Sequence, residues 1–331
     1  MSESNPNTVL QVNNLKTFFF VEDGEVKAVD GIDFHVESGE VFSLVGESGC
    51  GKTVTSLSII GLVGKPGKVV DGEVLFEGKD LLKLSTEELQ KIRGNQISMI
   101  FQQPQSSLNP VINVGDQVSE VFEIHTDFHK SENWEKAVAM LRQVGIPSPD
   151  KKAFAYPHEM SGGQAQRVMI AMALLLSPKL LIADEPTTAL DVTIQAQILD
   201  LMRDLKEKMN TAIILITHDL GVVAEMADRV GVMYAGKIVE QCSVEALFAE
   251  PLHPYSKGLI ESVPILGKLK KRLEVIEGNV PDLINLPKGC TFASRCKERI
   301  EHQIQQCTEL MPDLIEHKPG HQVRCWLYQE E

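Results

Sequence analysis

The sequence has no long apolar run and no secretory leader. The apolar stretch Ala171–Leu176 ends at Ser177 and Pro178, far short of the ~18 residues that a membrane helix needs. The N-terminus, MSESNPNTVLQV, lacks the basic region and the apolar region of a secretory signal. We therefore expect the chain to reach a membrane only by docking on a partner.

The sequence also lacks positive charge: the formal net charge is −14 over 331 residues. A nucleic-acid binder usually presents a basic face to phosphates, and attachment to anionic lipid needs basic clusters. The acidic balance disfavours both kinds of partner. Six cysteines in a chain without a signal peptide indicate reduced thiols or metal ligands instead of disulfides.

The composition is that of an ordinary globular protein, with 43% hydrophobic and 24% charged residues. Between Val41 and Tyr234, apolar strands alternate with helices, which predicts an α/β fold with a mostly parallel sheet covered on both faces. A strand pair is predicted around Val69–Gly78, with Asp71-Gly72 as its turn.

Two segments depart from this alternation. From Pro104 to about Gly145 the pattern is helical and polar, which indicates an inserted helical lobe. Beyond Pro251 the rhythm breaks, and the Pro- and Cys-containing tail to Glu331 is predicted to form a small separate module.

A phosphate-binding loop is predicted between the apolar strand Val41–Val45 and the next helix. Glycines let a backbone wrap tightly so that its N–H groups point at phosphate oxygens, and the helix presents its positive end. Lys52 would neutralise the β- and γ-phosphates and Thr53 would coordinate magnesium. The segment that fits the pattern GxxxxGK[ST] is Gly46-Glu47-Ser48-Gly49-Cys50-Gly51-Lys52-Thr53. A chance glycine-rich turn is the alternative, and the placement between a strand and a helix argues against it.

An acidic pair follows another apolar strand, Leu180–Ala183. Asp184 would hold the magnesium, directly or through water. Glu185 would orient and polarise the attacking water as a general base. Taken alone, this pattern also fits a strand that simply leaves the core, but the upstream phosphate loop favours the catalytic interpretation.

A second phosphate-binding device narrows the class of ATPase. Ser161-Gly162-Gly163-Gln164 precedes a predicted helix, and a helix N-terminus of this kind binds anions. With this turn, the chain resembles the ABC ATPases over nearly its whole length. The resemblance implies that the turn closes over the γ-phosphate held by the opposite subunit. Met160 stands where the family usually has leucine, a substitution that conserves volume.

The resemblance implies further roles in the same order along the chain. Gln102 is similar to the glutamine that senses magnesium and the attacking water. Asp191, with Ala189 and Leu190 before it, resembles the loop that couples the two sites of a dimer. His218 resembles the switch histidine that contacts the γ-phosphate and organises the general base.

The resemblance also implies an aromatic residue stacked on adenine. Phe19 is our choice, Phe18 and Phe20 are its rivals, and core packing is the alternative. The implied fold is a P-loop NTPase with a RecA-like core of the ABC ATPase type and an antiparallel β subdomain. The nucleotide-binding domain would cover residues 1–250 with a helical subdomain at about 104–165, and a C-terminal extension would cover 251–331.

The tail carries four cysteines in a spacing that matches no common zinc pattern. The segment His253–Leu259 resembles the hinge of the oligopeptide/dipeptide importer ATPases. That resemblance implies a four-iron–four-sulfur cluster, with zinc or four unrelated thiols as alternatives. The four residues are Cys290, Cys296, Cys307 and Cys325. Cys50 and Cys242 lie elsewhere and are not counted as ligands.

The resemblance implies an ATP- and Mg²⁺-dependent motor that powers the import of dipeptides or oligopeptides. It would work peripherally on the cytoplasmic face of the cell membrane. Its partners would be a second ABC ATPase in a heterodimer, two transmembrane permease subunits and, indirectly, an extracytoplasmic solute-binding protein. Nickel, glutathione or another small solute are alternative cargoes. A redox-sensing subunit and a soluble ABC ATPase acting on DNA or ribosomes are the alternatives from other classes.

Overall fold

The computed structural model describes residues 7–187, 191–262 and 276–329, and the chain divides into two compact units. The first unit comprises Met1–Val9, Val36–Glu40 and Lys83–Leu215. The second comprises Leu10–His35, Val41–Leu82 and Ile216–Glu331.

The first unit contains a run of parallel, buried strands. The neighbours, in order, are β8 (Ala212–Ile216), which ends at the border of the unit, β7 (Leu180–Asp184) and β6 (Ile97–Ile100). β6 and β7 are parallel, with Ile97 opposite Leu180. Every residue of β7 and β8 is buried, as expected for strands covered on both faces.

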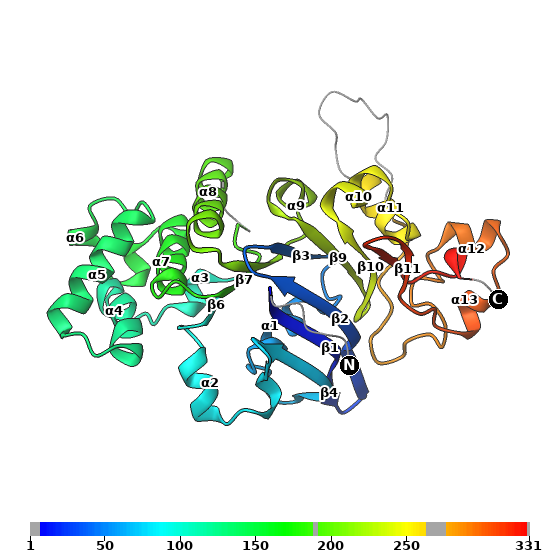
Figure 1. Ribbon diagram of the computed structural model, residues 1–331, viewed down its shortest axis with the longest axis horizontal. Coiled ribbons are helices and arrows are strands. Elements are labelled where there is room, and N and C mark those ends of the chain that lie inside the picture. Colours follow the sequence, from blue (N-terminus) through cyan, green and yellow to red (C-terminus); the bar gives the residue numbers. More distant parts are fainter. Residues whose placement is uncertain (1–6, 188–190, 263–275, 330–331) are drawn as a thin grey trace. The chain divides into compact units, whose positions relative to one another are not determined.

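The helices of the first unit include the predicted helical lobe, which is confirmed. Helices α4 and α5 pack against each other, and α7 packs against both (Figure 1). The helical elements are α2 (Thr86–Ile92), α3 (Pro104–Ser107), α4 (Val114–His125), α5 (Lys130–Gln143), α6 (Pro149–Lys152), η2 (Pro157–Glu159), α7 (Gly162–Leu174) and α8 (Val192–Met209).

An antiparallel sheet lies mostly in the second unit, in the order β2-β1-β4-β5. Its strands are β1 (Thr8–Val21), β2 (Gly24–Glu37), β4 (Gly67–Phe76) and β5 (Lys79–Asp80). The predicted turn at Asp71-Gly72 is wrong, because β4 runs through both residues. Gly72 has a φ of 103° and lies at an irregularity in the pairing with β1, so the Asp-Gly pair makes a bulge and not a hairpin.

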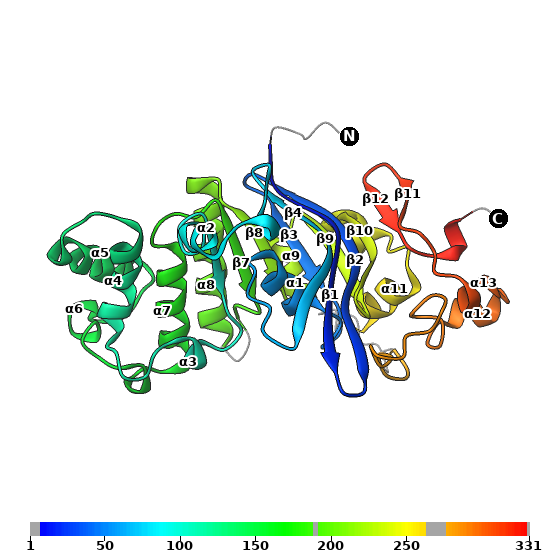
Figure 2. The same cartoon turned by 90° about the horizontal axis from the view of Figure 1, so that it is seen from below.

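The second sheet of this unit runs in the order β11-β12-β10-β9-β3. Its strands are β3 (Val41–Val45), β9 (Arg229–Tyr234), β10 (Lys237–Ser243), β11 (Ile315–Lys318) and β12 (His321–Val323). β3 and β9 are parallel, whereas β10 pairs antiparallel with both β9 and β12. Two strands of the tail therefore extend this sheet at β10 (Figure 2).

The helical elements of the second unit are short. They are α1 (Lys52–Ile59), η1 (Leu81–Lys83), α9 (Leu220–Met226), α10 (Val244–Ala249), α11 (Pro254–Glu261), α12 (Lys297–Glu301), α13 (Gln306–Glu309) and η3 (Trp326–Tyr328). In the parts of the chain that the structure describes, no helix has the length and apolarity needed to cross a membrane.

A buried carboxylate fastens the tail to β10. Glu240 is 0% exposed and accepts hydrogen bonds from the backbone N–H groups of Leu252 (2.7 Å) and His253 (2.8 Å). The Nε2 atom of His321 on β12 lies 2.7 Å from Glu240 Oε1. Burial acts to raise the pKa of Glu240, but these hydrogen bonds outweigh it and lower the pKa below its ordinary value.

Candidate functional site

The loop between β3 and α1 depends on glycine at two positions. Gly46 and Gly51 have φ values of 153° and 110°, in the region that side chains rarely adopt. A Cβ at Gly46 would collide with the carbonyl of Met233, and one at Gly51 with the carbonyl of Ala28. Beside Gly49, by contrast, there is open space. The loop therefore leaves room next to its backbone where a phosphate oxygen fits.

Helix α1 begins at Lys52, directly after this loop, and no side chain caps its N-terminus. Lys52 is only 6% exposed, and its Nζ donates to the carbonyls of Gly46 (2.7 Å) and Glu47 (3.0 Å). Thr53, in the first turn, is exposed. A helix N-terminus, an ammonium group and a hydroxyl thus meet at one loop, the donor set that a polyphosphate and its metal ion require.

Cys50, inside the loop, is a buried thiol. Burial raises its pKa, although the neighbouring Lys52 ammonium acts in the opposite direction. The thiol is therefore neutral at pH 7, and its sulfur accepts a hydrogen bond of 3.7 Å from Lys52 Nζ.

Two residues of the tail contact the same loop, and the sequence analysis did not identify either as a site residue. The hydroxyl of Tyr255 accepts a hydrogen bond of 2.8 Å from the backbone N–H of Glu47. Arg295 forms an ion pair with the carboxylate of Glu47, at 2.8 Å. Both pairings join residues more than two hundred positions apart, with separations of 208 and 248 in the sequence, so local patterns carry no signal of them.

The acidic pair is placed by β7 in the first unit. Asp184 ends the strand and is 1% exposed, and Glu185 follows in a left-handed conformation with φ 48°. The Nε2 atom of Gln102, two residues after β6, donates to Glu185 Oε2 at 2.8 Å. The structure therefore brings two of the three predicted catalytic residues into direct contact.

The Ser-Gly-Gly-Gln turn forms a reciprocal cap on α7. Ser161 Oγ accepts from the backbone N–H of Gln164 (3.3 Å), and Gln164 Oε1 accepts from the backbone N–H of Ser161 (3.4 Å). Ser161 and Gly162 are exposed, and a Cβ at Gly162 would meet nothing. The start of α7 is thus open to a ligand or to a partner.

Three other predicted residues lie at ends of elements. Asp191 caps α8 by accepting from the backbone N–H of Ile194 (3.0 Å), while Ala189 and Leu190 lie outside the described residues. His218 is exposed, two residues after β8. Phe19, on β1, is opposite Gly67 on β4 and partly exposed.

The two rivals of Phe19 differ from it in environment. The Lys27 ammonium lies 5.8 Å from the centre of the Phe18 ring, and Phe20 is 46% exposed. A Cβ at Gly67 would come within 2.7 Å of the Phe19 ring. The ring therefore packs directly on the Gly67 backbone, where a larger residue would collide with it. Which of the three stacks on adenine stays a prediction.

The four tail cysteines lie near one another: the pKa of Cys290 and of Cys325 is raised first by burial and then by other thiols of this group. Cys290 donates its backbone N–H to the carbonyl of Cys307 at 2.8 Å, and Cys296 Sγ accepts from the backbone N–H of Arg299, which caps α12. Cys325 packs in an apolar cluster with Leu252 and Val323. Burial raises the pKa of Cys290 to about 11 and of Cys325 to about 12, so these thiols are neutral.

Comparison with known families gives two matches that follow one another along the chain. Residues 29–188 match the family model described as ABC transporter. Residues 239–302 match the one described as Oligopeptide/dipeptide transporter, C-terminal region.

Individual relatives match from end to end. AppD of Bacillus subtilis (strain 168), described as an oligopeptide transport ATP-binding protein, is 54% identical over 325 residues, covering 98% of each chain. The chain belongs to the ATP-binding proteins of the ABC transporter family, in the oligopeptide/dipeptide group. DppD of the same organism, described as a dipeptide transport ATP-binding protein, is 49% identical over 97% of this chain and 95% of its own.

Solved structures agree with this assignment and confirm the predicted P-loop NTPase fold of the ABC type. The dimeric, post-hydrolysis structure of the ATP-binding cassette MJ0796, bound to ADP and Pi, has a TM-score of 0.65 and 27% identity. It covers 71% of this chain and 98% of that chain. The assignment to the ABC family implies that the chain binds ATP and Mg²⁺.

The predicted iron–sulfur cluster is wrong. The relatives in this oligopeptide group are described as transport ATP-binding proteins, and their descriptions name no iron–sulfur protein. Within the described residues, the one group of three ligand-type side chains with ligand atoms within 4.8 Å of one another is Glu240, Cys242 and His321. Among the residues that the structure describes, the tail thiols form no such group, and Cys296 and Cys325 have capping and packing contacts that need no metal.

Proposed function

We propose that the chain is the ATP-hydrolysing subunit of an importer for dipeptides or oligopeptides. One observation carries the proposal: a glycine-built phosphate loop lies in a chain that matches peptide-transport ATP-binding proteins from end to end. The relatives' descriptions favour peptides over nickel, glutathione or other small solutes as cargo.

The loop and α1 would bind the phosphates of ATP. Lys52 would exchange its two carbonyl partners for the β- and γ-phosphate oxygens, and exposed Thr53 would hold magnesium together with Asp184 and Gln102. The metal would neutralise charge on the transferred phosphoryl group. The proposed nucleotide contacts are Phe19, Gly46, Glu47, Ser48, Gly49, Cys50, Gly51, Lys52, Thr53, Gln102, Ser161, Gly162, Gly163, Gln164, Asp184 and Asp191.

Glu185 would accept the proton of the attacking water, a general-base contribution of typically ~10²–10⁴-fold. Its contact with Gln102 supports this role, because the amide donates to Glu185 Oε2 at 2.8 Å and so orients the carboxylate. His218 would contact the γ-phosphate from the end of β8.

Two subunits would enclose the nucleotides. The open cap of α7 supports this arrangement, and the similar cassette MJ0796 is dimeric with ADP and Pi bound. We propose a heterodimer with a second ABC ATPase and two transmembrane permease subunits, supplied indirectly by a solute-binding protein. The chain would lie peripherally on the cytoplasmic face of the membrane, with an ATPase domain at 1–250, its helical subdomain at about 104–165 and an extension at 251–331.

Transport in vesicles tests the proposal. The full chain is assembled with its permease subunits, and ATP-dependent uptake of a labelled oligopeptide is compared with uptake of glutathione and nickel. Lys52→Ala should reduce hydrolysis and uptake at least about 100-fold, since it removes a charge that stabilises the transition state. Lys79→Ala, an exposed lysine on β5, is the matched control and should leave both unchanged. ATP-dependent uptake of nickel or glutathione without uptake of the labelled oligopeptide would contradict the peptide assignment.

A further inference from the structure

Glu47, the second residue of the phosphate loop, is held at three polar groups. Its carbonyl accepts from Lys52 Nζ at 3.0 Å, and its backbone N–H donates to Tyr255 OH at 2.8 Å. Its carboxylate accepts two hydrogen bonds from Arg295, from the two terminal nitrogens, at 2.8 and 3.1 Å. Two of the three anchors come from the tail, and the third joins Glu47 to the lysine that would contact the phosphates.

Every N–H donor of the Arg295 guanidinium has a hydrogen-bond partner. Besides the two bonds to Glu47, it donates from Nε to the carbonyl of Glu277 (2.9 Å) and from a terminal nitrogen to the carbonyl of Ile276 (3.2 Å). A further bond reaches Tyr234 OH at 3.3 Å. A guanidinium has five N–H donors, and all five have partners here. These contacts fix the orientation of the guanidinium that pairs with Glu47.

The surroundings keep this ion pair away from bulk water. The Arg295 side chain is 5% exposed and that of Glu47 is 27% exposed. The guanidinium lies 5.8 Å from the ring centre of Tyr234 and 5.9 Å from that of Phe292. A paired, largely buried arginine–carboxylate contact is stronger and more directional than a surface ion pair.

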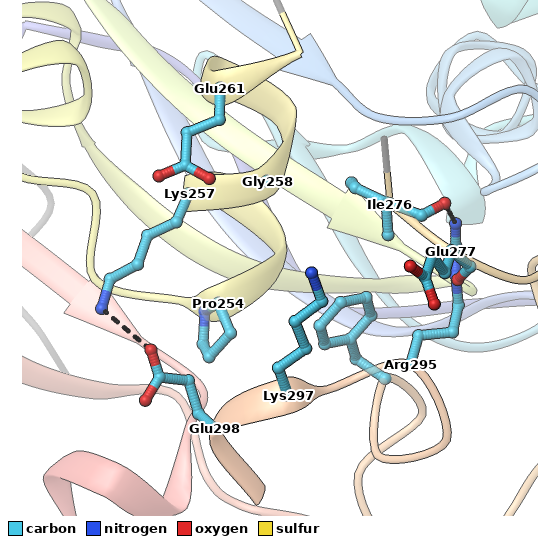
Figure 3. Close-up of a pocket in the computed structure, with 10 residues that line it drawn as sticks. Pro254, Lys257, Gly258, Glu261, Ile276, Glu277, Arg295, Lys297 and Glu298 are labelled. Carbon is cyan, nitrogen blue, oxygen red and sulfur yellow. Dashed lines mark hydrogen bonds and ion pairs between the residues drawn. The ribbon is translucent and has the colours of Figure 1, made fainter. Parts of the chain in front are cut away.

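Arg295 lies on the wall of a pocket of the tail (Figure 3). In this view it lies beside Ile276 and Glu277, whereas Lys257 and Glu298 pair with each other at 4.0 Å on the other side of the pocket. Lys297 lines the same pocket. Since Arg295 occupies both carboxylate oxygens of Glu47, it is the cation of this pocket that reaches the phosphate loop.

We infer that Arg295 is a positioning residue for ATP binding: through Glu47 it holds the backbone of the phosphate loop in the conformation that receives the phosphates. The inference rests on the proposed nucleotide site. Without the guanidinium, Glu47 keeps only its two backbone anchors, and the loop samples conformations that bind phosphate less well. The loss should appear in the KM for ATP and not in the chemical step, because Arg295 touches none of the residues proposed for proton transfer.

The test is a double-mutant cycle on ATP hydrolysis by the assembled transporter containing the full chain. Arg295→Gln and Glu47→Gln should each raise the KM for ATP about tenfold with kcat within about twofold. Arg295→Lys, which keeps the charge but not the two-pronged geometry, should recover part of the loss. The double variant should be no worse than either single variant, since both remove one interaction. Lys297→Gln is the control and should leave the KM unchanged.

The outcomes separate this inference from the proposed function. A wild-type transporter that does not hydrolyse ATP would refute the function itself. An unchanged KM in Arg295→Gln with normal wild-type hydrolysis would overturn the inference alone, as would independent, multiplying effects of the two single variants. If Arg295→Gln fails to fold, Glu47→Gln tests the same contact from the loop side without altering the tail.

Discussion

Two loops of this chain each follow a buried parallel strand, and they are built in opposite ways. The loop after β3 has glycine at each position where φ is strongly positive, namely Gly46, Gly49 and Gly51. The loop after β7 begins with Glu185, a carboxylate residue at φ 48°. Glycine adopts such angles freely, whereas another residue loses about 1–2 kcal/mol. One loop thus leaves its backbone open to a ligand, and the other holds a carboxylate residue in a strained conformation.

The largest expected effect comes from the strained loop. Glu185→Gln keeps the backbone and the size of the side chain but removes the proposed base. The kcat for ATP hydrolysis should fall ~10²–10⁴-fold, while ATP binding is retained or tightened. Equilibrium binding of ATP and single-turnover hydrolysis by the same preparation measure both quantities. Hydrolysis at the wild-type rate would remove Glu185 from the proposed mechanism.

A substitution in the glycine-built loop should impair ATP binding before it impairs the chemical step. Gly51→Ala places a Cβ against the Ala28 carbonyl, so the KM for ATP should rise at least about tenfold before the chemical step is affected. Gly78→Ala is the matched control, because its φ is 79° and its surroundings are open. It should lower the free energy of unfolding by about 1 kcal/mol and leave the KM unchanged. Equal effects of the two substitutions on the KM would contradict the comparison.

The smallest effect concerns the buried thiol of the glycine loop. Because burial raises the pKa of Cys50, its thiolate is scarce at pH 7, and alkylation should be slow. The rate should rise about tenfold per pH unit below that pKa, and ATP should slow it further. Mass spectrometry of labelled Cys50 against pH, with and without ATP, gives the profile. A rate independent of pH between 7 and 9 would show that the thiolate is already formed at pH 7, which would contradict a pKa raised by burial.

The sequence predicted the parts of the site that depend on neighbours along the chain. The strand Val41–Val45, the glycines of the loop and the helix from Lys52 all lie within a few residues, and the structure confirms these elements. The proximity of Gln102 and Glu185 follows from the predicted parallel sheet, because parallel strands bring their carboxyl ends to one edge.

What the sequence could not predict depends on long-range pairing or on a choice between two turn geometries. The Asp71-Gly72 pair fits a hairpin as well as a bulge, and only the pairing of β4 with β1 decides. Strands β11 and β12 are short and polar, without the alternation that marks a strand, so their place beside β10 was not visible. Arg295 and Tyr255 gave no local signal, since their partner lies at the other end of the chain.

The pairing of β12 with β10 bears on how the chain can be divided. β10 has β9 on one side and β12 on the other. A chain shortened at residue 250 would leave β10 as an open edge with unpaired N–H and C=O groups, a surface that templates aggregation. It would also leave the Glu240 carboxylate without its partners from Leu252, His253 and His321. The tail therefore covers the outer edge of β10, and we expect a chain shortened at residue 250 to aggregate more readily than the full chain.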